Sequence, residues 1–159
     1  MNLRNKELVD VLIDKNFKIS CAESCTGGLL ASNIVEIPAA SQVFDMAFVT
    51  YANEAKVQLV NVKEKTIGAY GVVSEEVAKE MAIGCAKKAN ANIGVGISGI
   101  AGPTGATPTK PVGMVCFGFY INGAIYTYTK QFGNIGRTEV RVASVTFVID
   151  TLLELLKSA

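Results

Sequence analysis

Hydrophobic and polar positions along the chain follow two different spacings, which predicts that helices and strands alternate. Apolar residues at helical spacing predict helices over Leu3 to Lys15, from the glycines at 27 and 28 to about Val35, from Ser74 to about Ala89, and over Arg137 to Lys157. Asn53 is typical of an N-cap and predicts a further short helix that carries Glu54, Lys56 and Leu59. Runs rich in apolar and β-branched residues predict strands over Phe17 to Ala22, Ala47 to Tyr51, Ile93 to Ser98, Val112 to Ile121 and Ala124 to Gln131. Asn122-Gly123 joins the last two strands and is a strong hairpin signal. The order predicts an α/β/α sandwich around a mixed sheet.

Length and composition favour a single domain over residues 1–159. Half of the residues are hydrophobic and only 18% are charged, so the chain has enough apolar surface for a sizeable core. The same excess of apolar surface leads us to expect a homo-oligomer. Fifteen basic and fourteen acidic residues leave a formal charge of +1. Without a basic excess we expect neither nucleic acid nor a membrane surface as a partner.

The absence of histidine limits the chemistry that the chain can perform. It excludes a Ser-His-Asp or Cys-His nucleophile pair and every histidine-ligated metal site. The four cysteines do not form two close pairs, so their spacing does not indicate a zinc site. The charged N-terminal segment lacks the apolar core of a signal peptide, and Val112 to Ile121 is too short to span a bilayer. We therefore expect a reduced, cytoplasmic protein.

The predicted strand-to-helix turn from Glu23 to Gly28 is the first candidate site. A serine here, Ser24, could project its hydroxyl as a nucleophile, with the amides of Cys25, Thr26 and Gly27 as donors to an anion. Two alternatives remain at this stage. Ser24 or Thr26 could simply cap the following helix, and Cys25 could be the nucleophile because thiols at helix starts have a lowered pKa.

Tyr51 and Lys56 form the second candidate site, at the end of one predicted strand and in the first turn of the next helix. The positive end of the helix dipole and burial would both lower the pKa of this lysine. A serine activated by lysine, with tyrosine as a relay, is a reasonable hydrolytic arrangement in a protein without histidine. The alternative is a solvated lysine beside a half-buried tyrosine.

Two further segments carry candidate ligand-binding residues. The loop after Ile93 to Ser98, which contains Gly102, has the small residues and free amides that suit phosphate or ribose. It matches neither the Walker A pattern nor a dinucleotide fingerprint. Arg137 and Arg141 lie four residues apart and could clamp a phosphate, although they could equally pair with Glu139 or face solvent.

Taken in order, four motifs resemble a single family. They are Ala22-Glu23-Ser24-Cys25-Thr26-Gly27-Gly28-Leu29, Tyr51-Ala52-Asn53-Glu54-Ala55-Lys56, Gly71-Val72-Val73-Ser74-Glu75-Glu76-Val77-Ala78, and Ser98-Gly99-Ile100-Ala101-Gly102-Pro103-Thr104-Gly105 closed by Lys110-Pro111-Val112-Gly113. The chain is similar, from about Asn5 to Leu156, to the CinA C-terminal domain family of nicotinamide-nucleotide amidohydrolases.

The resemblance implies that nicotinamide mononucleotide is hydrolysed to nicotinate mononucleotide and ammonia without a metal or organic cofactor. It implies Ser24 as nucleophile, Tyr51 and Lys56 as its polar partners, and ligand contacts from Ser98, Arg137 and Arg141. From the residues themselves we expect an oxyanion hole made by the amides of Cys25, Thr26 and Gly27, and contacts to phosphate and ribose from the arginines and the Gly102 loop. Two other functions remain open at this stage, a non-catalytic nucleotide-binding domain and an amidase for a related nucleotide.

Overall fold

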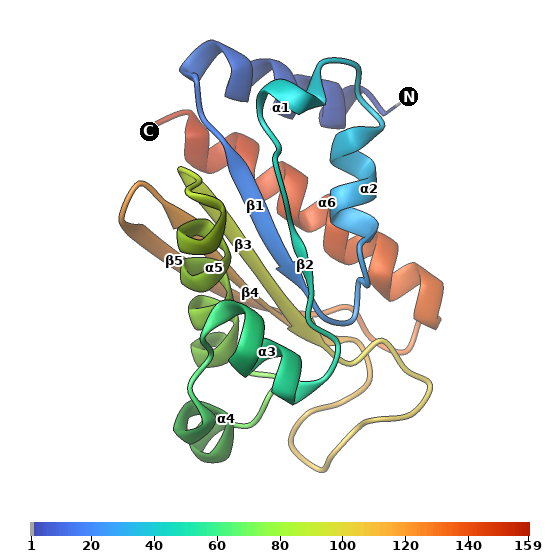
Figure 1. Ribbon diagram of the computed structural model, residues 1–159. Helices are drawn as coiled ribbons and strands as arrows, with labels where there is room; N and C mark the ends of the chain where they lie inside the picture. The colour runs from blue at the N-terminus through green and yellow to red at the C-terminus, as the bar shows by residue number, and fades with distance from the viewer. Residues whose placement is uncertain (1) are drawn as a thin grey trace.

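Five strands form one mixed sheet at the centre of the computed structural model, which describes residues 2–159 (Figure 1). The strands are β1 (Ile19–Glu23), β2 (Phe48–Val49), β3 (Ile93–Gly99), β4 (Met114–Ile121) and β5 (Ala124–Gln131). Their order across the sheet is β2-β1-β3-β4-β5. Strand β1 is parallel to β2 and β3, whereas β4 is antiparallel to both β3 and β5. The predicted mixed sheet and the hairpin at Asn122-Gly123 are confirmed.

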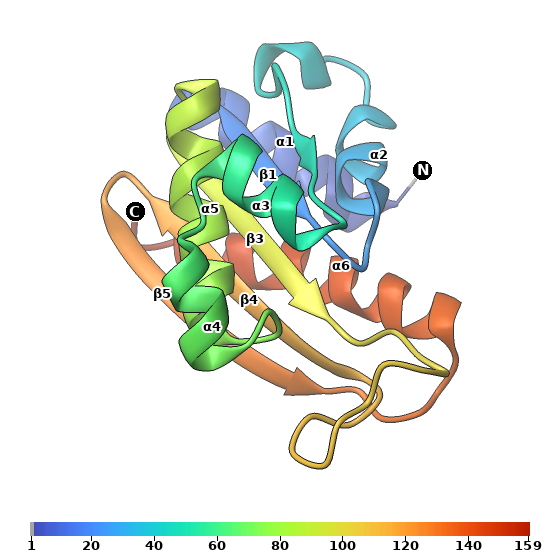
Figure 2. The same ribbon diagram turned by 60° about the horizontal axis from the view of Figure 1, so that its bottom comes forward.

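Helices cover both faces of the sheet, as the two ribbon views show (Figures 1 and 2). One face carries α1 (Leu3–Lys15), α2 (Leu29–Val35) and α6 (Arg137–Leu156), and the other carries α3 (Asn53–Val60), α4 (Glu64–Tyr70) and α5 (Glu75–Ala89). A short 3₁₀ helix, Ala40–Gln42, lies between α2 and β2. The α/β/α sandwich predicted from the sequence is therefore confirmed.

Tertiary contacts explain the local differences from the sequence-based elements. Helix α4 was not predicted because it has only seven residues, and its first turn is held by Glu80 of α5. The Glu80 carboxylate accepts from the Lys63 amide at 2.8 Å and from the Thr66 hydroxyl at 2.7 Å. Asn53, predicted as a helix cap, is instead the first residue of α3, and its neighbour Ala52 occupies the cap position.

Close packing of α5 on the sheet accounts for the glycines that interrupt the strands. A Cβ at Gly94 or Gly96 of β3 would collide with the carbonyl oxygens of Ala82 and Ala78 in α5, and one at Gly118 of β4 would collide with that of Ala78. The glycine pair in β3 therefore lets a helix approach the sheet and opens no nucleotide-binding turn.

The chain brings all its candidate motifs to one edge of the sheet. Because β1, β2 and β3 are parallel, their carboxyl ends meet at this edge, where open α/β sheets bind ligands. The loop from β3 to β4 and the start of α6 lie at the same edge, in the lower half of Figure 2.

Candidate active site

A cavity of about 300 Å³ opens at the carboxyl ends of β1, β2 and β3. Four segments line it: the turn after β1, the segment from the end of β2 into α3, the α4–α5 connection, and the loop after β3, with one side chain from α6 completing the wall. The lining residues are Ser24, Cys25, Tyr51, Asn53, Lys56, Val72, Val73, Ser98, Gly99, Ile100, Ala101, Gly102, Thr104, Gly105 and Arg137. The only charged side chains among them are a lysine and an arginine, so the cavity favours an anionic ligand.

Lys56 is the most unusual residue of this cavity, because its long cationic side chain is only 1% exposed. Its Nζ donates to three acceptors: the Thr50 carbonyl at 2.7 Å, the Ser24 Oγ at 3.0 Å and the Tyr51 carbonyl at 3.3 Å. No carboxylate pairs with it among residues 2–159. Burial lowers the pKa of Lys56 from 10.5 to about 8. The sequence-based alternative of a solvated lysine is therefore wrong.

The turn after β1 presents Ser24 to this lysine. The Ser24 amide donates to the Ile97 carbonyl of β3 at 3.0 Å, and its carbonyl accepts from the Gly27 amide at 3.1 Å. Gly27 and Gly28 have φ angles of 57° and 99°, in the left-handed region that glycine adopts without strain. Two successive glycines thus let the chain reverse sharply between β1 and α2.

Glu23 performs the capping role that the sequence-based alternative assigned to Ser24 or Thr26. Its buried carboxylate accepts from the amides of Leu30 and Ala31 in the first turn of α2, at 2.9 and 3.0 Å. Neither hydroxyl caps this helix: Ser24 Oγ accepts from Lys56, and the buried Thr26 Oγ1 has no hydrogen-bond partner in the described chain. The Ser24 hydroxyl is therefore free for chemistry with the lysine.

Cys25 is a poor rival nucleophile in this environment. Burial raises the pKa of its thiol from 9.0 to about 11. At neutral pH it therefore stays a thiol, although it belongs to the cavity wall.

Tyr51 and Arg137 meet at the mouth of the cavity. The Tyr51 side chain is 63% exposed, and its hydroxyl accepts from Arg137 Nη2 at 3.0 Å. Arg137 Nη1 donates to the Gly102 carbonyl at 2.8 Å, so this arginine links the turn after β2 to the loop after β3. Within residues 2–159 no hydrogen bond joins the Tyr51 hydroxyl to Ser24 or Lys56, and only the Tyr51 carbonyl contacts Lys56.

The other predicted ligand-binding residues divide into two groups. Cys25, Ser98, Gly102 and Arg137 line the cavity, although the Ser98 hydroxyl is occupied by the Val72 carbonyl at 2.8 Å. Thr26, Gly27 and Arg141 do not line it.

In that second group, Thr26 is fully buried. Arg141 donates to the carbonyls of Cys25 and Thr26 in the serine turn, which is the turn after β1 that carries Ser24. Neither Arg137 nor Arg141 pairs with Glu139 in the described part of the chain.

Eight residues that line the cavity were not predicted as site residues: Asn53, Val72, Val73, Gly99, Ile100, Ala101, Thr104 and Gly105. All eight lie within the motifs quoted above, but no chemistry of their own distinguishes them. Within residues 2–159 there is no cluster of histidine, cysteine or acidic side chains that could hold a metal ion, and no helix long and apolar enough to cross a membrane.

A sequence model described as the CinA C-terminal domain matches residues 2–156, nearly the whole chain. The chain belongs to the CinA C-terminal domain family. A CinA-like protein of Kosmotoga olearia is 48% identical to this CinA domain over 143 residues, which are 90% of this chain and 34% of the relative. The domain spans about a third of the length of the curated relatives it matches.

Solved structures of the family have the same fold as this CinA domain. The competence/damage inducible protein CihA from Agrobacterium tumefaciens is 39% identical, with a TM-score of 0.90 over 98% of this chain and 99% of that one. A CinA superfamily protein from Klebsiella pneumoniae is 31% identical, with a TM-score of 0.95 over 98% and 97% of the two chains.

Proposed function

We propose that this domain hydrolyses the carboxamide of nicotinamide mononucleotide with Ser24 as nucleophile and Lys56 as general base. The observation that carries the proposal is the set of three acceptors around the Lys56 Nζ. A neutral amine has two N–H bonds and one lone pair. When the Thr50 and Tyr51 carbonyls take the two N–H bonds, the lone pair is left for the Ser24 hydroxyl. The environment thus orients the amine as a base toward one hydroxyl.

Proton transfer and bond changes balance in two half-reactions. Lys56 takes the Ser24 proton while Oγ bonds to the carboxamide carbon, and the resulting ammonium gives that proton to the leaving nitrogen as the C–N bond breaks. Ammonia departs and leaves an ester on Ser24. Water then attacks the ester carbon, one of its protons passes through Lys56 to the serine oxygen, and the product leaves as a carboxylic acid that ionises to the carboxylate.

Two neighbouring groups support this chemistry. Because a peptide group is planar, the bond from the Gly27 amide to the Ser24 carbonyl turns the Cys25 amide to the opposite side of the turn. We assign the developing oxyanion to this Cys25 amide, since Thr26 is fully buried and the Gly27 amide is already occupied. Tyr51 contributes through its carbonyl, which orients Lys56, and through its hydroxyl, which orients Arg137.

The charge of the cavity supports a phosphorylated substrate. Arg137 lies in the cavity wall with no carboxylate partner in the described chain, and its guanidinium suits a phosphate group. No acidic residue lines the cavity, so nothing there repels an anion.

The test is ammonia release from nicotinamide mononucleotide by the purified domain, compared with Ser24→Ala and Lys56→Met. Lys6→Met is the matched control, because Lys6 is half-exposed and paired with Asp10 on α1. We expect both site variants to lose activity by about 10³-fold or more, and the control to keep it.

Other outcomes would identify the alternatives. A wild-type domain that binds the nucleotide in calorimetry but releases no ammonia would favour a non-catalytic binding domain. Activity on another amide-bearing nucleotide, with none on nicotinamide mononucleotide, would keep the chemistry and replace the substrate. Wild-type turnover in Ser24→Ala would refute the acyl-enzyme route.

A further inference from the structure

Arg141 holds the turn that carries the proposed nucleophile, and it does so from outside the cavity. Its Nε donates to the Cys25 carbonyl at 3.1 Å and its Nη2 donates to the Thr26 carbonyl at 2.9 Å. Each hydrogen bond is charge-assisted, and the guanidinium fork reaches two successive carbonyls at once. Arg137, one helical turn earlier on α6, instead reaches the cavity mouth.

The remaining polar groups of the turn complete the same framework. The Ser24 amide bonds to β3, the Ser24 carbonyl accepts from the Gly27 amide, and the Thr26 carbonyl also accepts from the Leu29 amide at 3.0 Å. The Cys25 carbonyl has Arg141 as its hydrogen-bond partner. Without that guanidinium, the peptide between Cys25 and Thr26 would lose its orientation, and the planar neighbouring peptide would be free to turn with it.

Because Gly27 and Gly28 both have left-handed φ angles, the conformation of this turn depends on hydrogen bonds from other segments. A backbone with little steric restriction at Gly27 and Gly28 gains conformational freedom as soon as its hydrogen bonds are lost. Glu23 fixes the far end of the turn through the α2 amides, and Arg141 fixes the middle. The nucleophile is therefore held between an anionic and a cationic side chain, neither of which lines the cavity.

We propose that Arg141 is a positioning residue for Ser24 and the Cys25 amide, and that the substrate anion is left to Arg137 alone. The inference rests on the proposed function for Ser24 as the nucleophile and for the substrate. Its core, that Arg141 determines the reactivity of Ser24, is independent of which amide is cleaved.

The experiment uses Arg141→Met and Arg141→Lys, with Arg141→Ala for rescue by added guanidinium ion, in two assays. The first is the rate at which a fluorophosphonate probe labels Ser24, which requires no natural substrate. The second is kcat and KM for nicotinamide mononucleotide.

We expect Arg141→Met to lower the labelling rate and kcat together by about 10²-fold, with KM within about twofold of wild type, because small displacements of a reacting group have effects of this size. Arg141→Lys should be intermediate, and added guanidinium ion should restore part of the labelling rate of Arg141→Ala.

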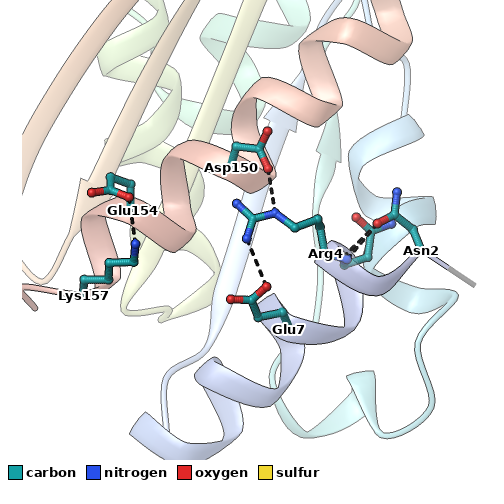
Figure 3. Close-up of polar contacts among 7 residues, drawn as sticks. Asn2, Arg4, Glu7, Asp150, Glu154 and Lys157 are labelled. Carbon is teal, nitrogen blue, oxygen red and sulfur yellow. Dashed lines mark hydrogen bonds and ion pairs between the residues drawn. The ribbon is translucent and has the colours of Figure 1, made fainter.

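The matched control is Arg4→Met. Arg4 lies on α1, donates to Asp150 of α6 at 3.0 Å and to Glu7 at 3.0 Å (Figure 3), and does not line the cavity. Arg4→Met therefore removes a charged contact of α6 that does not involve the serine turn, and it measures the effect of such a loss alone.

Two results would overturn the proposal. One is an increase of KM by 10-fold or more in Arg141→Met with unchanged labelling, which would make Arg141 a substrate ligand. The other is wild-type behaviour of Arg141→Met in both assays.

Failure of the proposed function has a different signature, in which the probe labels wild-type Ser24 but nicotinamide mononucleotide is not hydrolysed. Labelling of the Arg141 variants still tests the positioning role in that case. If Arg141→Met does not fold, as judged by circular dichroism, the Lys variant and guanidinium rescue decide.

Discussion

The pH dependence of the reaction tests the assigned base directly. Lys56 must be neutral to accept the Ser24 proton, and burial lowers its pKa from 10.5 to about 8. At pH 7 a lysine with a pKa of about 8 is roughly 10% neutral, whereas an unperturbed lysine is roughly 0.03% neutral. Burial therefore increases the neutral fraction of Lys56 at pH 7 by about 300-fold, which is the fraction that the proposed mechanism requires.

We expect log(kcat/KM) to rise with unit slope below pH 8 and to level off above it. The assay is stopped-time chromatography of nicotinate mononucleotide between pH 6 and pH 10, and the rate of fluorophosphonate labelling should follow the same curve. Lys56→Arg should be inactive over the whole range, because a guanidinium keeps the positive charge but cannot act as a base. Lys6→Arg is its matched surface control.

Three results would refute the reasoning. A flat profile between pH 6 and pH 9 would remove Lys56 as the base. A profile that still rises with unit slope up to pH 10 would mean that burial does not lower the pKa of Lys56. Activity in Lys56→Arg would show that its charge, and not proton transfer, matters.

Three further predictions concern the residues around this pair. Because the folded pKa of Lys56 lies below its unfolded value, the unfolded chain binds more protons between pH 8 and 10.5, and stability rises with pH in that window. The unfolding free energy of wild type minus that of Lys56→Met should therefore increase by about 3 kcal/mol from pH 7 to 10.5 in urea titrations, and a constant difference would contradict the shift. Cys25→Ala should keep its rate of ammonia release within about threefold of wild type, because we do not expect a thiol with a pKa of about 11 to act as the nucleophile. Loss of fluorophosphonate labelling in Cys25→Ala would make Cys25, and not Ser24, the nucleophile. Glu23→Gln should lower the unfolding free energy by about 1–3 kcal/mol, since an amide has one acceptor oxygen for the Leu30 and Ala31 amides, and an unchanged urea midpoint would exclude the capping role.

Local patterns in the sequence determined most of the fold, because they act over distances that the chain itself sets. The periodicity of Leu3–Lys15, the Ser74 cap of α5 and the Asn122-Gly123 turn each specify an element through neighbours a few residues away. Helix α4 was missed because its start depends on Glu80, which lies in a different helix.

In the candidate site too, the sequence indicates the residue types, whereas contacts between distant segments determine their surroundings. The absence of histidine and the order of the motifs indicate Ser24 and Lys56 from the sequence alone, because chemistry restricts which residue types can replace an imidazole. Spacing could not reveal that Lys56 is buried, that the Tyr51 hydroxyl faces Arg137, or that Glu23 and not Ser24 caps α2.

Arg137 and Arg141 show most clearly why the sequence pattern cannot assign the surroundings of a side chain. Four residues apart on one helix, Arg137 and Arg141 are equivalent in sequence pattern. Only the tertiary structure gives one of them the cavity mouth and the other the serine turn. The acceptors of Arg137 lie 35 and 86 residues away in the sequence, and those of Arg141 lie 116 and 115 residues away. Residue types and order thus determined which chemical groups are available, and packing at the sheet edge decided where each of those side chains lies.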